Sequence, residues 1–373
     1  MRLKERWNYL RQTPKLVWDI MVRRCYDFKY DLMPAHASQM TIQKQLNLLR
    51  TGVNLIYRRT HAWGWPIHMH VELTNYCNIK CKVCPTGIGT LKRQPAAIEP
   101  ALFERLMSEV GPYLLTTSLW GWGEPLLHPQ LADTLRIMQN HRVVTFLSTN
   151  GQNLDDESIL QALIKYPPTY LIVCLDGITD ETNSLFRVGA KINPALTGVR
   201  RLSQMRRQKD SKLPILHFRY IVMKQNEHEL PQLPKFAAEN QFDLMTIRTL
   251  SIIDAPDDTY NELIPNDEKF RAYDYRNNKR IKRTDFICEK AFTFPAVFAD
   301  GTVVACEQDY NAQQPYGSLA DGLSFADIWW SKRAVEIRKT IRENPEQFSF
   351  CKKCPFNDRP ISTCSIQYFD LST

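Results

Sequence analysis

The feature of this sequence that most restricts its fold is an alternation of strand-like and helix-like segments between residues 66 and 252. The predicted strands are short apolar runs: Ile67–Leu73, Leu114–Leu119, Val143–Ser148, Tyr170–Leu175, Leu216–Met223 and Leu244–Thr249. The predicted helices between them are Ala101–Val110, Pro129–Asn140, Glu157–Lys165, Pro194–Gln208 and Glu229–Glu239. Such alternation indicates parallel strands joined by right-handed crossovers, and six units are too few to close a (β/α)8 barrel. The sequence therefore predicts an α/β fold built on a partial (β/α)6 TIM barrel.

Length and composition are those of a globular enzyme with more than one domain. The chain has 373 residues, of which 43% are apolar and 24% charged. No apolar run reaches the length that crosses a bilayer, and the N-terminal run "MRLKERWNYLRQTPK" lacks the features of a signal peptide. We therefore expect a cytoplasmic protein, in which the ten cysteines serve metal binding, catalysis or packing rather than disulfides.

The positive charge of the chain is concentrated at its N-terminal end. Residues 1–60 contain twelve Lys and Arg against four Asp and Glu, so their net charge of +8 equals that of the whole chain. Apolar residues at helical spacing, Trp7 and Trp18 among them, interleave with these charges, which predicts a helical extension. A basic amphipathic helix can lie on an anionic membrane or bind a partner. It can equally pack on the next domain with its charges in water.

Chemically distinctive residues follow the predicted strands, where ligands collect in α/β folds. Cys77, Cys81 and Cys84 follow the first strand in the pattern C-x3-C-x2-C. The residues after the second, third and fourth strands are Glu124 in "GWGEP", Asn150 in "STNG" and Asp176 in "LDG". Thiolates are soft ligands for Fe–S clusters or zinc, and three of them leave one iron of a four-iron cluster without a protein ligand.

In these motifs and their order the sequence resembles the radical S-adenosylmethionine (SAM) superfamily, over almost all of residues 66–373. The resemblance implies that Cys77, Cys81 and Cys84 bind three irons of a [4Fe–4S] cluster. It also implies that the amino and carboxylate groups of SAM chelate the fourth iron, which accounts for the number of cysteines. The alternative is that these cysteines bind zinc or are simply buried.

The same resemblance assigns contacts with SAM. The run Gly121–Trp122–Gly123–Glu124 is similar to the family's GGE motif, with Trp122 in place of a glycine, and Glu124 would bind the methionyl ammonium. The other implied contacts are Ser148, Asn150, Asp176 at the ribose, Arg187 at the carboxylate, and Asn226. Asn226 could instead be a loop or helix-capping residue. Cys174 stands where many relatives have a serine, and we expect it to be a small buried residue.

A second group of cysteines lies near the C-terminal end: Cys288, Cys306, Cys351, Cys354 and Cys364. The run "AFTFPAVFADGTVVAC" predicts a β-hairpin that turns at Asp300–Gly301. Four thiolates from this hairpin and the C-x2-C could surround a metal, and spacing alone leaves zinc open. C-x12-G-x4-C followed by C-x2-C-P resembles the auxiliary-cluster domain called SPASM, in the truncated form called Twitch. That resemblance implies one auxiliary [4Fe–4S] cluster on the first four cysteines, with Cys364 spare or replacing one ligand.

We therefore predict three domains: a basic helical extension over residues 1–65, a radical SAM partial barrel over 66–262, and a small Cys-rich SPASM/Twitch auxiliary-cluster domain over 263–373. The resemblance implies reductive cleavage of SAM to methionine and a 5′-deoxyadenosyl radical, which abstracts hydrogen from an unactivated C–H. With the auxiliary cluster accepting an electron, we expect a net oxidation of a small hydroxylated or lipid-like metabolite. Groups that could act on the substrate proton are Arg219, Arg248, Tyr220 and Glu307.

Two other functions stay open at this point. One is a radical SAM maturase that modifies a peptide or protein, although residues 1–65 show no clear hairpin strands of a leader-binding domain. The other is a zinc-stabilised, non-enzymatic binding protein. The expected partners are the substrate, an external electron donor such as flavodoxin or ferredoxin and, through residues 1–60, a membrane surface. Nucleic acid is not expected, because the basic residues form no recognised binding motif.

Overall fold

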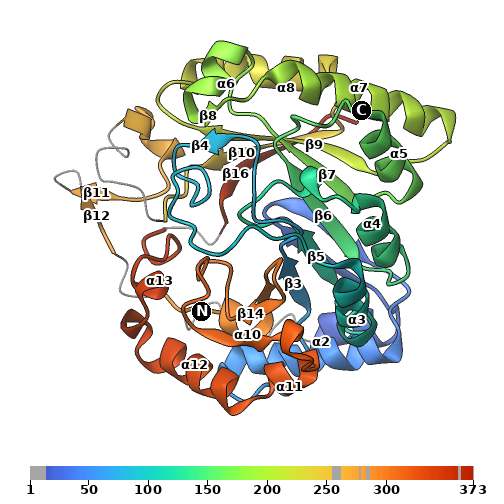
Figure 1. Cartoon of the computed structure of the whole chain (residues 1–373), viewed down its shortest axis with the longest axis vertical. Helices are drawn as coiled ribbons and strands as arrows, with labels where there is room; N and C mark the ends of the chain where they lie inside the picture. The colour runs from blue at the N-terminus through green and yellow to red at the C-terminus, as the bar shows by residue number, and fades with distance from the viewer. Residues whose placement is uncertain (1–13, 254–261, 277–278, 283–285, 360–362, 373) are drawn as a thin grey trace.

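The computed structural model describes the chain except residues 1–13, 254–261, 277–278, 283–285, 360–362 and 373 (Figure 1). Six parallel strands lie side by side in chain order. They are β3 (His68–Val71), β5 (Thr116–Leu119), β6 (Val144–Thr149), β7 (Tyr170–Cys174), β9 (Ile215–Val222) and β10 (Leu244–Thr249). All six coincide with predicted strands, so the partial (β/α)6 barrel is confirmed.

Helices cover the outer face of this curved sheet (Figure 1). They are α3 (Pro100–Val110), α4 (Leu131–Gln139), α5 (Glu157–Lys165), α7 (Ile192–Gln208) and α8 (Leu233–Glu239). Each buries one apolar stripe: in α3 the buried residues are Phe103, Leu106, Met107 and Val110, at the spacing of one helix face. Asp156 caps α5 by accepting hydrogen bonds from the amides of Ser158 and Ile159. The helices thereby hold the strand ends, and the loops after them, in fixed positions.

The extension is not entirely helical, which corrects the prediction. Residues 14–21 are helical and α2 spans Ile42–Tyr57, but β1 (Tyr26–Tyr30) and β2 (Met33–Ala37) between them form an antiparallel hairpin. Alternate residues of β1 and β2 are less exposed, which is the period of a strand rather than of a helix. The turn residues Asp31 and Leu32 both have positive φ, 51° and 70°, as in the tight turns that suit hairpins.

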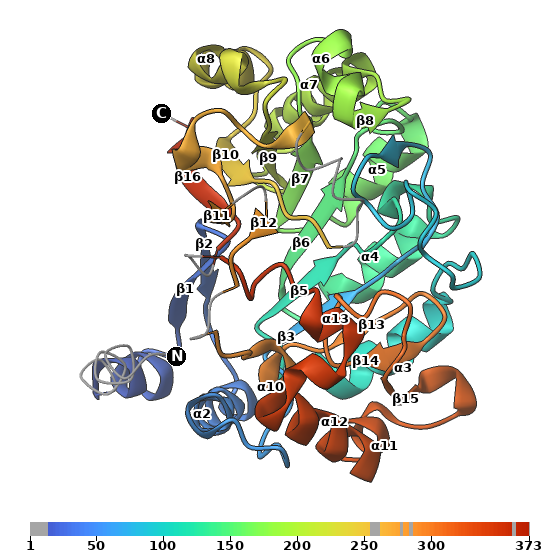
Figure 2. The same cartoon turned by 90° about the vertical axis from the view of Figure 1, so that its left-hand side faces the viewer.

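The hairpin is packed into the barrel. Tyr30 stacks on His68 of β3 and Phe146 of β6, with ring centroids 5.2 and 4.4 Å apart, and its hydroxyl lies 2.9 Å from Ser118 Oγ. Met33 is fully buried. Figure 2 shows the hairpin on the side of the sheet opposite to β4 (Lys80–Cys81). The hairpin therefore closes one end of the barrel, and the cysteine loop lies at the other.

The C-terminal region extends the same sheet at both edges. The predicted hairpin is present: β13 (Ala296–Val297) and β14 (Thr302–Val304) pair around Gly301, whose φ is +85°. β13 pairs in parallel with β3, and β15 (Pro315–Ser318) continues from β14. At the opposite edge β16 (Ser365–Asp370) pairs antiparallel with β10. The result is one ten-stranded sheet, whose two edges come from the C-terminal region.

The remaining elements are short or lie in the C-terminal third. The helices are α6 (Asp180–Phe186), α10 (Lys290–Thr293), α11 (Phe325–Trp329), α12 (Lys332–Glu343) and α13 (Ser349–Lys352). The 3-10 turns are η1 (Pro125–Leu127), η2 (Glu227–Gln232), η3 (Glu268–Phe270), η4 (Leu319–Asp321) and η5 (Pro345–Gln347), and the short strands are β8 (Arg187–Val188), β11 (Tyr275–Arg276) and β12 (Lys279–Arg280). None of the helices in the described part of the chain combines the length and apolarity needed to cross a membrane.

Candidate functional site

The loop after β3 carries Cys77, Cys81 and Cys84. The amide of Cys84 donates to the carbonyl of Cys81 over 3.2 Å, and β4 pairs with β8 so that Cys81 lies opposite Arg187. The pKa of the Cys81 thiol is raised to about 12, mainly by burial and also by the neighbouring Cys84 and Cys77, while Arg187 opposes the rise. Three thiols are thus brought together in a loop whose fold depends on Gly87, because a Cβ there would lie 2.4 Å from the carbonyl oxygen of Cys81.

Glu124 lies directly behind this loop and is almost fully buried, at 3% exposure. Its carboxylate accepts hydrogen bonds from the Leu126 amide (3.0 Å), the Thr149 hydroxyl (2.7 Å) and the Asn150 amide (2.7 Å). Burial raises its pKa, while these donors oppose the rise. Glu124 therefore joins the ends of β5 and β6, a role that sequence reasoning missed. Three of the roughly four acceptor positions of a carboxylate are used, which leaves about one for a ligand.

The two glycines of "GWGEP" are required by close packing. A Cβ at Gly121 would lie 2.4 Å from the Glu72 side chain, and one at Gly123 would lie 2.3 Å from the Thr74 carbonyl. Trp122 between them points to the C-terminal region, where its indole Nε1 donates to the carbonyl of Glu307 over 3.0 Å. The position at which this chain departs from the family motif thus contacts the residue that follows Cys306.

Two predicted residues lie at the end of β6 beside the cysteine loop. The Asn150 side-chain amide approaches Cys77 Sγ at 3.5 Å and donates to Asn78 Oδ1 over 2.8 Å. A donor beside a thiolate ligand is one way in which proteins tune a cluster. Ser148 Oγ lies 3.3 Å from Sγ of Cys174, which is buried in the barrel interior with Phe146 and Ile172, as expected for a small buried residue.

Asp176, Arg187 and Asn226 form a group at the ends of β7 and β9. Arg187 Nε lies 2.7 Å from Asp176 Oδ2 as an ion pair without hydrogen-bond alignment, and Asp176 Oδ1 accepts from the Ile221 amide over 2.8 Å. Asn226 uses both hydrogens of its amide on the carbonyls of Asp176 and Ile221. The structure thus places all three near Cys81 and shows that Asn226 holds the loop, while their contacts with SAM stay predictions.

Four cysteines of the second group line one cavity of about 410 Å³: Cys288, Cys306, Cys351 and Cys354. Burial raises the pKa of each of these thiols, to about 12 for Cys354, and nearby thiols add to the rise for Cys306, Cys351 and Cys354. Within the described ranges, no three Cys, His, Asp or Glu side chains converge on a point suited to one metal ion. A cluster spreads its thiolate ligands over separate irons, so a cavity ringed by four thiols fits it. Cys364 does not line this cavity.

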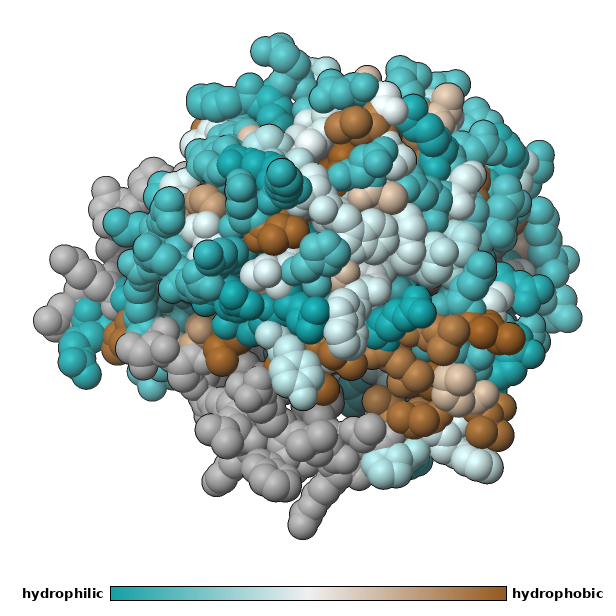
Figure 3. All heavy atoms as spheres, turned by 90° about the horizontal axis from the view of Figure 1, so that it is seen from below, coloured by the Kyte–Doolittle hydropathy of each residue, from teal (hydrophilic) through white to brown (hydrophobic). Residues whose placement is uncertain are grey.

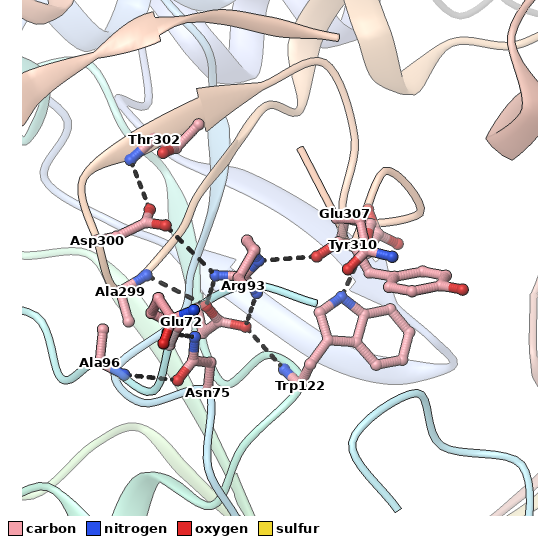
Figure 4. A network of polar contacts seen from close by, with 12 residues as sticks. Glu72, Asn75, Arg93, Ala96, Trp122, Ala299, Asp300, Thr302, Glu307 and Tyr310 are labelled. Atoms are coloured by element: carbon pink, nitrogen blue, oxygen red, sulfur yellow. Dashed lines mark hydrogen bonds and ion pairs between the residues drawn. The ribbon is translucent and has the colours of Figure 1, made fainter. Parts of the chain in front are cut away.

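A buried network ties the two cysteine regions together (Figure 4). Glu72, fully buried at the end of β3, accepts two hydrogen bonds from Arg93, over 2.7 and 2.8 Å. The same carboxylate accepts from the amides of Trp122 (3.0 Å) and Ala299 (3.1 Å). Arg93 Nε also donates to the Tyr310 carbonyl over 2.7 Å. One carboxylate thus fixes the loop after the cysteines, the "GWGEP" loop and the turn of the C-terminal hairpin. In the sequence, the sign of this network was a charged residue, Glu72, inside the predicted apolar strand before Cys77.

A second cavity, of about 460 Å³, reaches both cysteine regions. Cys81 and Cys84 line it on one side, and Glu307 and Pro355, which follow Cys306 and Cys354, line it on the other. Its polar and charged lining residues also include Tyr30, Asp31, His70, Arg219, Arg248, Lys290 and Cys364. Of the four groups proposed for proton transfer, three line this cavity. Tyr220 does not, because its hydroxyl donates to Glu229 Oε2 and the Asn226 carbonyl.

The charges of this cavity are mostly paired. Asp31, from the hairpin turn, lies 3.1 Å from Arg248 Nε, and Lys290 forms an ion pair with Glu307. Burial lowers the pKa of His70 to about 4, so its imidazole is neutral near pH 7. Sequence reasoning missed Asp31, His70 and Lys290, because only the fold brings the N-terminal hairpin and α10 to the barrel.

Family models match two parts of the chain: residues 71–237 match the radical SAM superfamily, and residues 288–355 match the iron–sulfur cluster-binding domain SPASM. They lie within the predicted second and third domains, whose boundaries stay predictions. The tungsten-containing aldehyde ferredoxin oxidoreductase cofactor-modifying protein of Pyrococcus furiosus is 22% identical over 78% of this chain and 88% of its own length. The mycofactocin maturase MftC of Mycobacterium ulcerans is 26% identical over 49% of this chain and 47% of its own length.

Solved structures support the same fold. Streptococcus suis SuiB bound to its precursor peptide SuiA superimposes with a TM-score of 0.59 at 15% identity, over 96% of this chain and 89% of that one. SuiB bound to S-adenosylmethionine gives 0.57 at 16% identity, over 86% and 82%. With the two family matches and the cysteine-lined cavities, this places the chain in the radical SAM superfamily as an enzyme that carries a SPASM domain and binds SAM and two [4Fe–4S] clusters.

Proposed function

We propose that this enzyme carries out a net oxidation of a small molecule held between its two clusters. The observation that supports the proposal is the cavity of about 460 Å³, whose lining includes Cys81 and Cys84 as well as Glu307 and Pro355 beside the second cysteine group. Pockets of a few hundred cubic ångströms are typical of small-molecule sites. A substrate there lies within reach of both redox groups.

We assign the cluster and cofactor contacts to the residues predicted from the sequence. Cys77, Cys81 and Cys84 hold the cluster that binds SAM, and Cys288, Cys306, Cys351 and Cys354 hold the auxiliary cluster. The residues assigned to SAM are Gly121, Trp122, Gly123, Glu124, Ser148, Asn150, Asp176, Arg187 and Asn226. When bound, SAM and the first cluster supply a 5′-deoxyadenosyl radical that removes a substrate hydrogen, and the auxiliary cluster supplies an acceptor for the remaining electron.

The chain's own residues orient the substrate and take its proton. Oxidation by loss of a hydrogen atom and an electron also releases a proton from the substrate. His70 lines the cavity, and its imidazole is neutral because burial lowers its pKa to about 4. Because burial disfavours its charged form, His70 relays this proton rather than holding it, and Tyr30 and Trp120 line the cavity around it. An external flavodoxin or ferredoxin supplies the electron that starts the reaction.

The decisive experiment removes the auxiliary cluster alone. Anaerobically reconstituted wild-type enzyme and the Cys351→Ala/Cys354→Ala variant are incubated with SAM, a reductant and a metabolite extract. The variant should still form 5′-deoxyadenosine but should yield no oxidised product. Its electron paramagnetic resonance spectrum should show no signal from a reduced second cluster. Equal yields of oxidised product from both proteins would overturn the proposal.

Modification of a peptide is the second candidate, and two comparisons favour it: a relative is named a mycofactocin maturase, and SuiB was solved with a precursor peptide. The hairpin β1–β2 also removes the argument that the extension lacks hairpin strands. Separate peptide and small-molecule fractions of an extract, each tested for substrate-dependent 5′-deoxyadenosine, distinguish peptide modification from oxidation of a small molecule.

Membership of the superfamily makes the chain an enzyme and leaves the prediction of a zinc-stabilised, non-enzymatic binding protein without support.

We further propose that the extension places the enzyme at an anionic membrane surface in the cytoplasm. The helical residues 14–21 pack on α2, where Gln45 Nε2 donates to the Ile20 carbonyl, and they leave Trp18 59% and Val22 55% exposed. The other exposed large apolar residues of these two segments are Val17, Met21, Ile42, Leu46 and Tyr57. Figure 3 shows apolar side chains gathered on the underside of the molecule. Together with the net charge of +8 on residues 1–60, such a surface is typical of peripheral membrane contact.

A further inference from the structure

Arg219 is a buried cation in the proposed substrate cavity that has no ion-pair partner of its own among the described residues. It lies on β9 with 5% of its surface exposed and lines the cavity. Among the described residues its guanidinium makes no hydrogen bond or ion pair, and its Nε is buried without an acceptor. Its nearest ring is that of Trp120, whose centroid is 5.7 Å from the guanidinium carbon. Buried charges are normally paired, so an unpaired guanidinium that faces a cavity indicates a ligand.

One anion of the cavity, Asp31, also attracts Arg219, but the oxygens of Asp31 are engaged elsewhere. Asp31 pairs with Arg248 and also accepts from the amides of Cys364 (3.0 Å) and Ser365 (2.8 Å). Glu307 pairs with Lys290. Among the described lining residues there are three cations, Arg219, Arg248 and Lys290, against two anions, Asp31 and Glu307. With the lining thiols counted as neutral, these side chains leave one positive charge in excess, and Arg219 is the one of the three cations that forms no ion pair.

The electrostatic environment of Arg219 would be relieved by an anion. Burial lowers the pKa of its guanidinium and the nearby Arg248 lowers it further, which means that the charged form is unfavourable as the site stands. Arginine nonetheless stays protonated in proteins. A carboxylate fits the planar fork of a guanidinium through two parallel hydrogen bonds, and as a monoanion it balances a single positive charge. A phosphate carries more negative charge than this cavity leaves uncompensated.

We propose that Arg219 binds a carboxylate of the substrate, so that the small molecule oxidised by this enzyme is a carboxylic acid. The inference rests on the proposed function, since it assumes that this cavity holds the substrate. The carboxylate would anchor one end of the molecule on β9 and leave the rest between Cys84 and the Lys290–Glu307 pair. Holding a substrate by one charged end fixes which of its C–H bonds faces the radical.

The test uses saturation-transfer NMR on the anaerobically reconstituted holoenzyme with three probes that carry methyl protons: propionate, its neutral isostere propionamide, and methyl phosphate. The variants are Arg219→Gln, which removes the charge, and Arg219→Lys, which keeps the charge but loses the fork. Arg201→Gln is the matched control, because Arg201 lies in an exposed ion pair with Glu157 on the outer surface. Iron content and substrate-independent SAM cleavage are measured for every protein to show that each is folded and loaded.

Wild-type enzyme and Arg201→Gln should bind propionate and not propionamide. Arg219→Gln should bind propionate at least about tenfold more weakly, since a charge-assisted pair is lost, and Arg219→Lys should fall between. Equal propionate binding by wild type and Arg219→Gln, or none by wild type, would overturn the proposal. Preference for methyl phosphate would overturn the carboxylate in favour of a phosphate. Failure of the proposed oxidation would instead appear in the auxiliary-cluster variant, which leaves Arg219 intact.

Discussion

Arg248 Nε lies 3.1 Å from Asp31 Oδ2, and this pair joins the last parallel strand of the barrel to the turn of the N-terminal hairpin. Asp31 in turn accepts from the amides of Cys364 and Ser365, at the start of β16. Three parts of the chain that are far apart in sequence thus meet at one carboxylate. The extension is part of the cavity wall rather than an appendage.

Asp31→Asn should destabilise the protein by about 2–3 kcal/mol, because it leaves Arg248 without its counter-charge. The loss should be smaller than for a fully buried ion pair, because the side chains of Arg248 and Asp31 are 21% and 13% exposed. The pKa of Asp31 is lowered by Arg248 and Arg219 against the effect of burial. Its contribution should therefore be complete above the ordinary carboxyl pKa of about 4 and should be lost as the pH falls below it. Anaerobic urea unfolding from pH 7 down to about pH 2 measures this. Asp27→Asn, in an exposed part of the same hairpin, is the control and should change little.

Replacement of Cys77, Cys81 and Cys84 together by Ala should remove about four irons per chain and all SAM cleavage. Iron analysis and 5′-deoxyadenosine assays after anaerobic reconstitution measure both. Cys174→Ala is the matched control, because Cys174 is buried among apolar side chains of the barrel and should not affect iron content. Full iron in the triple variant would contradict the assignment of the first cluster.

Cys354 and Cys364 should behave differently. Cys354 lines the cavity ringed by four thiols, so Cys354→Ala should lower the iron content by up to about four per chain. Cys364 lines the substrate cavity instead, so Cys364→Ala should keep all the iron. Iron loss in Cys364→Ala to the same extent would show that Cys364 is the ligand in place of one of the four.

Glu124→Gln should weaken SAM binding by about 1.5–3 kcal/mol, or roughly tenfold or more, if the carboxylate binds the ammonium of SAM. The variant also places an amide NH₂ against amide donors of Leu126 and Asn150, so a local structural effect must be separated. Thr149→Val provides this, since it removes one hydrogen bond to Glu124 and keeps the carboxylate. Equilibrium dialysis of SAM should show a much larger loss for Glu124→Gln than for Thr149→Val; equal losses would make Glu124 a structural residue only.

The membrane proposal predicts binding to anionic vesicles that falls steeply as salt is added, because each basic residue near the surface contributes about 1 kcal/mol at low salt. Deletion of residues 1–60 cannot test it, because the deletion removes the hairpin from the barrel interior. Trp18→Glu/Val22→Glu should instead lower vesicle binding at least about tenfold. Leu185→Glu/Leu323→Glu, at two other exposed apolar positions, is the control. A wild-type protein that sediments without vesicles at every salt concentration would rule the proposal out.

The parts of the fold that the sequence could predict are those in which local pattern and tertiary environment agree. The six parallel strands are largely buried, and apolar runs such as YLIVC in β7 mark them in the sequence. The hairpin at Gly301 is predicted by its "DG" turn. The N-terminal hairpin could not be predicted in this way. Its strands are short and interrupted by Asp27 and Lys29, and it is held by contacts such as Tyr30 with Ser118, which is 88 positions away. The local secondary-structure propensities of the hairpin residues carry no information about such long-range contacts.

The same distinction holds for the site. The cysteines could be assigned from spacing, because a cluster needs several thiolates from one loop. The actual partners of Glu124 depend on how the ends of β5 and β6 lie beside each other, and the isolation of Arg219 depends on which anions the fold has already paired. Pairing of charges is a property of three-dimensional proximity, which a linear pattern does not encode.

The pairing of β13 with β3 and of β16 with β10 has a consequence for how the protein is made. Both outer edges of the six-stranded barrel sheet are completed by segments that are synthesised after all six barrel strands. Until then the nascent chain exposes unpaired strand edges and six largely apolar strands, which are sites of aggregation. Contacts of such long sequence separation also form slowly. The two edges therefore stay open until β13 and β16 have been made, and deletion of β16 should harm the yield of folded protein as much as a mutation in its core.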